Sequence, residues 1–193
     1  MKFEYPEAIQ QLLVTLFHHP YMFKRLLIFL LVFQLVNPAR AQFDTAFVKS
    51  RIQLCADSMV LGFRAKNWEL YTRYTYPALI GSLGGKEAFI KYVSESFSSL
   101  PDSAWKKYET GNVLQIVKTA GDLQAIIELH MILEWQQMRI ITTHHLIAES
   151  WDGGMYWTFF DSQNDLASSA LIKPDISPSL IIPKRIEKVE SLH

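Results

Sequence analysis

The sequence predicts an α+β fold in which three N-terminal helices pack on an antiparallel sheet of about four strands. Apolar residues first recur at steps of three and four, which is typical of amphipathic helices. From Trp105 onward they alternate with polar residues, which is typical of strands that bury one face. Short turn sequences separate the alternating segments, so we expect consecutive strands to be antiparallel.

Three segments carry the helical pattern. Asp44 stands at the start of the first and can accept hydrogen bonds from the exposed amides of a helix start. Pro77 ends the second, because proline disfavours the helical conformation in the residue before it. Leu100-Pro101-Asp102 ends the third. The expected helices cover residues 44–63, 65–75 and 86–99, and a connector is expected over residues 77–85.

Four extended segments follow the helices. In the second, the odd-numbered residues from Leu123 to Trp135 are apolar and are assigned to the core, whereas Glu128 and His130 lie on the other face. Turns are expected at Ala120-Gly121-Asp122, Gln136-Gln137 and Asp152-Gly153-Gly154. The extended segments cover residues 105–118, 123–135, 139–150 and 155–161.

The last hairpin leads to a prediction about oligomeric state. If Trp151 pairs with Met155, then His145 shares a face with Trp157 and Phe159, and both faces of the sheet carry large apolar side chains. An antiparallel sheet usually leaves one face to water, so a second apolar face needs a cover. We therefore expect a homodimer. Residues 163–193 are rich in proline and are expected to form an extended tail.

The segment of residues 22–41 is predicted to be a cleaved signal peptide. Lys24-Arg25 is followed by the apolar run 26–36, and the small residues of Ala39-Arg40-Ala41 suit a signal peptidase that cuts after them. The run is shorter than the roughly 20 apolar residues that span a bilayer. We therefore expect export to the periplasm or the exterior without a membrane anchor. We also expect translation to start at Met22, so that residues 1–21 are an upstream extension.

Composition argues against several classes of function. The 19 Lys and Arg residues equal the 19 Asp and Glu residues in number and form no basic cluster, so nucleic-acid binding is not expected. Cys55 is the single cysteine, so no internal disulfide can form, and its apolar neighbours indicate a buried structural thiol. The adjacent His144 and His145 point to opposite faces of a strand and cannot bind one metal ion together. Neither a metal nor another cofactor is expected.

Three stretches carry a resemblance to a known superfamily. They are Trp68-Glu69-Leu70-Tyr71, Gly84-Gly85-Lys86-Glu87-Ala88-Phe89-Ile90 and the aromatic segment Asp152–Asp161. With helices followed by strands, the domain expected over residues 42–162 resembles the nuclear transport factor 2-like superfamily, which includes ketosteroid isomerases and polyketide cyclases. The resemblance implies a cone in which a curved sheet and the helices surround a pocket. Members include enzymes, immunity proteins and non-catalytic binding modules, so the resemblance assigns no activity.

Two functions follow from these features. The first is an exported, non-catalytic module that binds a small apolar ligand or a protein partner through its cone pocket or sheet face. The alternative is a cofactor-independent isomerase, dehydratase or cyclase with Tyr74 or His130 as donor or base. No catalytic residue is assigned, and convergence of these side chains with a carboxylate in one cavity would favour the enzyme. The pocket-lining candidates are Tyr71, Tyr74, Glu128, His130, His144, His145, Trp157 and Phe159.

Overall fold

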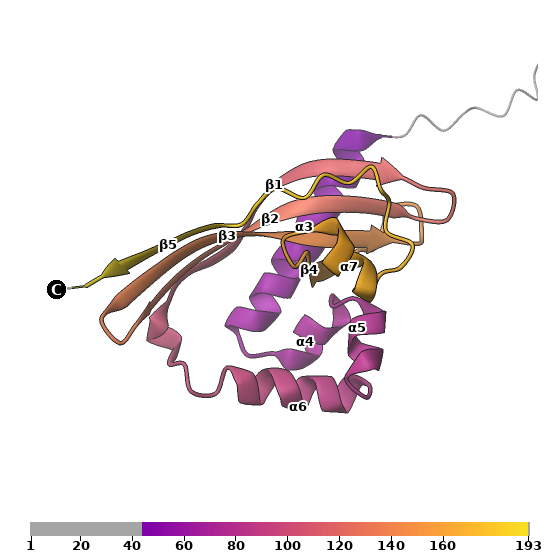
Figure 1. Cartoon of the computed structure of the whole chain (residues 1–193). Helices are drawn as coiled ribbons and strands as arrows, with labels where there is room; N and C mark the ends of the chain where they lie inside the picture. The colour runs from indigo at the N-terminus through magenta and orange to yellow at the C-terminus, as the bar shows by residue number, and fades with distance from the viewer. Residues whose placement is uncertain (1–43, 193) are drawn as a thin grey trace, which may run out of the picture. The chain divides into compact units, whose positions relative to one another are not determined.

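The computed structural model describes residues 44–192 and confirms an α+β fold with an antiparallel sheet (Figure 1). The predicted upstream extension and signal peptide lie outside the described residues. Within the described part of the chain, no helix is both long enough and apolar enough to cross a membrane.

Four helices precede the sheet in the described residues, so the prediction of three is wrong. The additional helix, α5, occupies the expected connector and begins at Pro77, because proline has the right backbone angle for a first helical position and needs no amide partner there. The N-caps Asp44 and Asn67 accept hydrogen bonds from Phe47 N and Leu70 N, each at 3.0 Å. The helices are α3 (Thr45–Arg64), α4 (Trp68–Arg73), α5 (Pro77–Ser82) and α6 (Lys86–Ser96), followed by the 3₁₀ turn η1 (Asp102–Ala104).

The sheet has five strands, and four of them follow the chain order β1-β2-β3-β4. The fifth, β5, pairs with the first half of β3 along the same edge that β4 occupies in its second half. The tight turn between β2 and β3 is made by Gln136 and Gln137, with φ of 51° and 62°. The strands are β1 (Trp105–Lys118), β2 (Leu123–Trp135), β3 (Met138–Ser150), β4 (Thr158–Asp161) and β5 (Ile186–Ser191), so the boundaries predicted for the first three hold within one residue.

The predicted register between β3 and β4 is wrong by one residue. The prediction placed His145 on the face of Trp157 and Phe159. In the structure Ala148 pairs with Phe159, which puts both aromatic rings on the face of His144 instead. Because side chains alternate along a strand, a slip of one residue moves every side chain to the opposite face.

The connection between these strands explains the slip. The Asp152 carboxylate accepts hydrogen bonds from the amides of Met155 and Tyr156, both at 3.0 Å, and from the Ser150 hydroxyl at 2.8 Å. Gly153 and Gly154 both have positive φ, at 78° and 96°. These bonds hold residues 151–157 in a wide loop, so pairing resumes only at Thr158 rather than directly after a tight turn.

Each face of the sheet carries its own apolar core. The inner face packs on α3 through residues such as Ile52, Ile127 and Phe159. The outer face carries Ile126, Ile147 and Phe160, and the chain itself covers them. Figure 1 shows α7 and the yellow C-terminal segment on this side of the sheet. The covering residues include Leu166, Ala170, Ile172, Ile176, Leu180 and Ile182.

The C-terminal segment is therefore part of the domain's packing. Asp165 caps α7 (Leu166–Ile172) by accepting a hydrogen bond from Ser168 N at 2.7 Å. The seven residues of α7 contain no proline, so a short helix can form before Pro174. The next residues cross the outer face, where Ile181 N donates to Gln115 Oε1 at 2.9 Å. The second apolar face, from which we predicted a homodimer, thus has an intramolecular cover.

Candidate functional site

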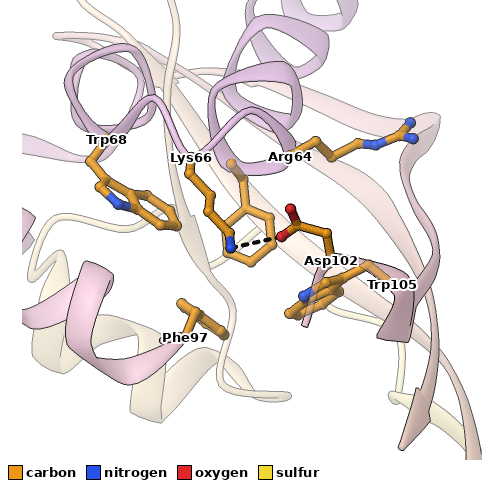
Figure 2. Close-up of a pocket in the computed structure, with 7 residues that line it drawn as sticks. Arg64, Lys66, Trp68, Phe97, Asp102 and Trp105 are labelled. Carbon is orange, nitrogen blue, oxygen red and sulfur yellow. Dashed lines mark ion pairs between the residues drawn. The ribbon is translucent and has the colours of Figure 1, made fainter. Parts of the chain in front are cut away.

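A cavity of about 170 Å³ opens where the end of α3, the start of α4, the end of α6 and the start of β1 meet (Figure 2). Gly62 allows α4 to lie close to α3 here, since a Cβ at this position would stand 2.7 Å from the backbone nitrogen of Tyr71. The cavity is lined by Phe63, Arg64, Lys66, Trp68, Phe97, Asp102 and Trp105.

Four aromatic side chains form the walls of this cavity. Phe63 is buried, and its ring lies edge-to-face with those of Phe97 at 4.9 Å, Trp105 at 5.0 Å and Trp68 at 5.8 Å between centroids. Such edge-to-face pairs stabilise by about 0.5–1.5 kcal/mol beyond the burial of area. The ring of Phe63 therefore fixes the other three, and the walls are ordered before a ligand arrives.

The backbone places a cation at the rim. Helix α3 ends in a Schellman motif, in which Asn67 N donates to Gly62 O at 2.8 Å and Lys66 N donates to Phe63 O at 3.0 Å. Lys66 occupies the left-handed position of the motif, with φ of 52°, where glycine is preferred and another residue costs about 1 kcal/mol. Its Nζ lies 2.7 Å from Asp102 Oδ1 across the cavity (Figure 2). Both side chains are largely exposed, so this ion pair is weak and a ligand can displace it.

Five of the predicted site residues lie on the inner side of the sheet. Tyr71 stacks on Phe89 at 6.2 Å, and burial raises the pKa of its phenol to about 12. Tyr74 stacks on Tyr156 at 5.5 Å. His144 Nδ1 lies 3.5 Å from Asp161 Oδ2. Trp157 and Phe159 are fully buried in the core against α3, and none of the five lines the cavity of Figure 2.

The other three predicted residues meet on the outer face. Glu128 on β2 pairs with His145 on β3, and His130 Nε2 lies 3.8 Å from Glu128 Oε2. The same carboxylate accepts a hydrogen bond of 2.9 Å from Asn112 N in an irregular stretch of β1. Gly111 leaves room for the contact between His130 and Glu128, because a Cβ at position 111 would stand 2.3 Å from His130 Nε2. Glu128 and His130 thus lie in contact with each other, on the face opposite Tyr74.

His145 makes the outer-face cluster sensitive to protons. Its side chain is buried, and its Nδ1 has no hydrogen-bond partner among the described residues. Burial lowers the pKa of this imidazole, although the neighbouring Glu128 carboxylate opposes the change. The structure therefore favours neutral His145.

Stability is expected to fall as the pH drops through about 6.5, the ordinary pKa of histidine. Unfolded His145 then binds a proton that the folded protein resists, which favours the unfolded chain. Urea denaturation between pH 7.5 and pH 5 is expected to show a steeper loss for the wild type than for His145→Gln. The carboxylates with lowered pKa, such as Asp161, titrate at lower pH in both proteins. Parallel pH profiles for the two proteins would contradict the assignment.

A third group of ionisable side chains surrounds a buried lysine. Lys173 has no exposed surface, and its Nζ lies 2.9 Å from both Asp122 Oδ2 and Asp175 Oδ1 and contacts Glu149 Oε1. In residues 44–192, the three carboxylates are close enough together to hold a metal ion. The lysine ammonium already lies among them and balances part of their charge, so the arrangement fits an internal ion cluster better than a metal site.

The sequence reasoning missed both the cavity and the lysine cluster. The cavity residues lie at the ends of four elements that are distant in sequence. The one local feature among them is the left-handed backbone conformation of Lys66. The sequence predicts a turn at Asp122 and an extended tail at Lys173, and it predicts no contact between them. Comparisons with protein-family models, curated protein sequences and solved structures found no match for this chain.

Proposed function

We propose that this protein is an exported binding module whose aromatic cavity takes a small apolar ligand. The observation that carries the proposal is the set of four aromatic walls around a cavity of about 170 Å³. A closed apolar cavity of about 150 Å³ in another protein binds benzene. The cavity here has a similar volume but is open and is also lined by Arg64, Lys66 and Asp102, so it suits a ligand of about one ring that carries a polar group. Binding pockets are typically apolar with a few polar groups that orient the ligand, which is the role we give to Lys66 and Asp102.

Two further features support the proposal. Helices followed by an antiparallel sheet agree with the element order of the nuclear transport factor 2-like superfamily, which the sequence resembles. The predicted signal peptide at residues 22–41 supports export. The enzyme alternative with Tyr74 and His130 as partners is less favoured, since these side chains lie on opposite faces of the sheet.

Titration of the purified protein with single-ring aromatic compounds, such as indole and p-cresol, is expected to change the fluorescence of Trp68 and Trp105. Phe97→Ala is expected to weaken binding by about tenfold, which corresponds to about 1.4 kcal/mol, because the ligand loses one wall. Tyr92→Ala is the matched control, since Tyr92 is an exposed aromatic residue on α6, the helix that Phe97 directly follows, and lies outside the cavity. Equal binding by both variants, or no binding of any ring compound to the wild type, would refute the proposal.

A further inference from the structure

The lysine cluster joins two parts of the chain that are distant in sequence. Lys173 follows α7 in the C-terminal segment, whereas Glu149 lies on β3 and Asp122 in the turn before β2. The side chains of Asp122 and Glu149 have 2% and 1% of their surface exposed. An amine and two carboxyl groups therefore lie in contact where little water can reach them.

Glu149 has the properties of an electrophile in this cluster. Its Oε2 is buried and has no hydrogen-bond partner among the described residues, so one carboxyl oxygen is left unsatisfied. Burial raises the pKa of this carboxyl. Contacts with Lys173 and Trp151 lower it in part, and the neighbouring Asp122 adds to the rise. A protonated carboxylic acid fits this buried position, because it carries no charge into the interior.

Asp122 has the properties of a base beside it. Burial alone would raise its pKa, but contacts with Thr119, Lys173 and Gln124 lower it. Gln124 is itself fully buried and donates through Nε2 to both Asp122 oxygens, at 3.1 and 3.0 Å. Two adjacent carboxyl groups whose pKa values are pushed in opposite directions form an acid–base pair.

Aromatic rings complete the surroundings of the amine. The Lys173 Nζ lies 5.2 Å from the centroid of Trp151 and 6.0 Å from that of Tyr76. Burial alone would lower the pKa of this amine, but its three carboxylate contacts raise it, so the ammonium form predominates. The amine becomes a nucleophile only when its proton moves to Asp122, so the reactive form is rare. The fixed contact between Lys173 and Glu149 offsets this rarity, because it gives the two groups a very high effective concentration.

We propose that Lys173 and Glu149 condense to an amide bond between their side chains. Asp122 takes a proton from the Lys173 ammonium, and the neutral Nζ attacks Cδ of the protonated Glu149. The C–N bond forms, and one C–O bond of the tetrahedral intermediate breaks as Asp122 returns the proton to the departing hydroxyl. Asp122 then takes the second proton from the nitrogen, so the products are a neutral amide, one water and a protonated Asp122. One water leaves, no electrons are gained or lost, and no other reactant is consumed.

The bond would tie the cover of the outer face to β3. It would close a loop between positions 24 residues apart, and thereby hold the C-terminal segment over Ile126 and Ile147. Closing a loop covalently stabilises a fold chiefly by restricting the unfolded chain. A protein with a single cysteine cannot obtain this effect from an internal disulfide.

The test is the intact mass of the purified protein under denaturing conditions. The wild type is expected to be lighter than its sequence by one water, and a protease digest is expected to contain one branched peptide that joins the segments around Glu149 and Lys173. Lys173→Met and Asp122→Asn are expected to keep the full mass, the first because the amine is gone and the second because the base is gone. Glu149→Gln is expected to give the same product mass as the wild type, because the side-chain amide releases ammonia where the acid releases water.

The outcomes separate covalent from ionic contact. A folded wild-type protein of full mass would overturn the proposal and leave a non-covalent ion cluster. Loss of water located at any other pair of residues would overturn it as well. The wild-type mass decides the question alone, so poor folding of a variant does not leave it open.

Discussion

Lys173→Met is expected to lower the free energy of unfolding by about 3–5 kcal/mol, the usual cost of removing one partner from a buried ion cluster. Without the ammonium, the buried carboxyl groups of Asp122 and Glu149 lose the cation that balances them. They must then take up protons or draw in water, and either change favours the unfolded chain. If Lys173 and Glu149 are joined by an amide, the variant instead loses the covalent closure of the loop, which also favours the unfolded chain.

Urea denaturation followed by circular dichroism measures the effect. Lys184→Met is the matched control, since Lys184 is exposed in the same C-terminal segment, and a change within about 0.5 kcal/mol is expected for it. Adding Glu149→Leu to Lys173→Met is expected to recover part of the loss, because the buried carboxyl group that has lost its amine partner is removed as well. Equal stabilities of Lys173→Met and the control would show that the cluster does not hold the fold.

Trp157→Ala is expected to cost about 3–5 kcal/mol, the range for truncating a large aromatic side chain in a core. Trp157 has no exposed surface and packs between α3 and the inner face of the sheet. Its indole also donates a hydrogen bond of 2.9 Å to Gly154 O, which anchors the wide loop before β4. The variant therefore loses both packing in the core and the bond that positions the loop.

Thermal and urea unfolding of Trp157→Ala and Trp135→Ala measure this cost against a tryptophan outside the core. Trp135 is 38% exposed at the end of β2, and its truncation is expected to change stability by less than about 1 kcal/mol. If both variants lost the same small amount, Trp157 would line an open space, as a pocket residue does, and the assignment to the core would be wrong.

Much of the secondary structure could be predicted because its signals are local. The alternation from Leu123 to Trp135 gave β2 its boundaries and its core face. Asp44 caps α3 as its residue type indicates. The turn at residues 152–154 was found by its glycines, but its width depends on hydrogen bonds from the Asp152 carboxylate, and those depend on where the backbone already lies.

The candidate site could be predicted only in fragments. Glu128 and His130 were recognised because they are two residues apart on one strand, and the structure confirms their contact. Tyr74 was grouped with them only by residue type, and the sheet separates it from both. The sequence analysis did not predict the four aromatic residues of the cavity, because no local pattern distinguishes an aromatic residue that lines a cavity from one that fills a core. They are Phe63, Trp68, Phe97 and Trp105.

The sequence by itself determined the fold class, the succession of helices and then strands up to β4, and which side chains of β2 face the core. Periodicity and turn chemistry act over a few residues and can be read without the rest of the chain. Only the tertiary structure decided that the C-terminal segment returns over the outer face, that Lys173 meets Glu149 and Asp122, and that four aromatic side chains enclose a cavity. These outcomes depend on contacts between distant residues, whose free energy comes from burial and charge balance in the assembled domain rather than from local conformational preference.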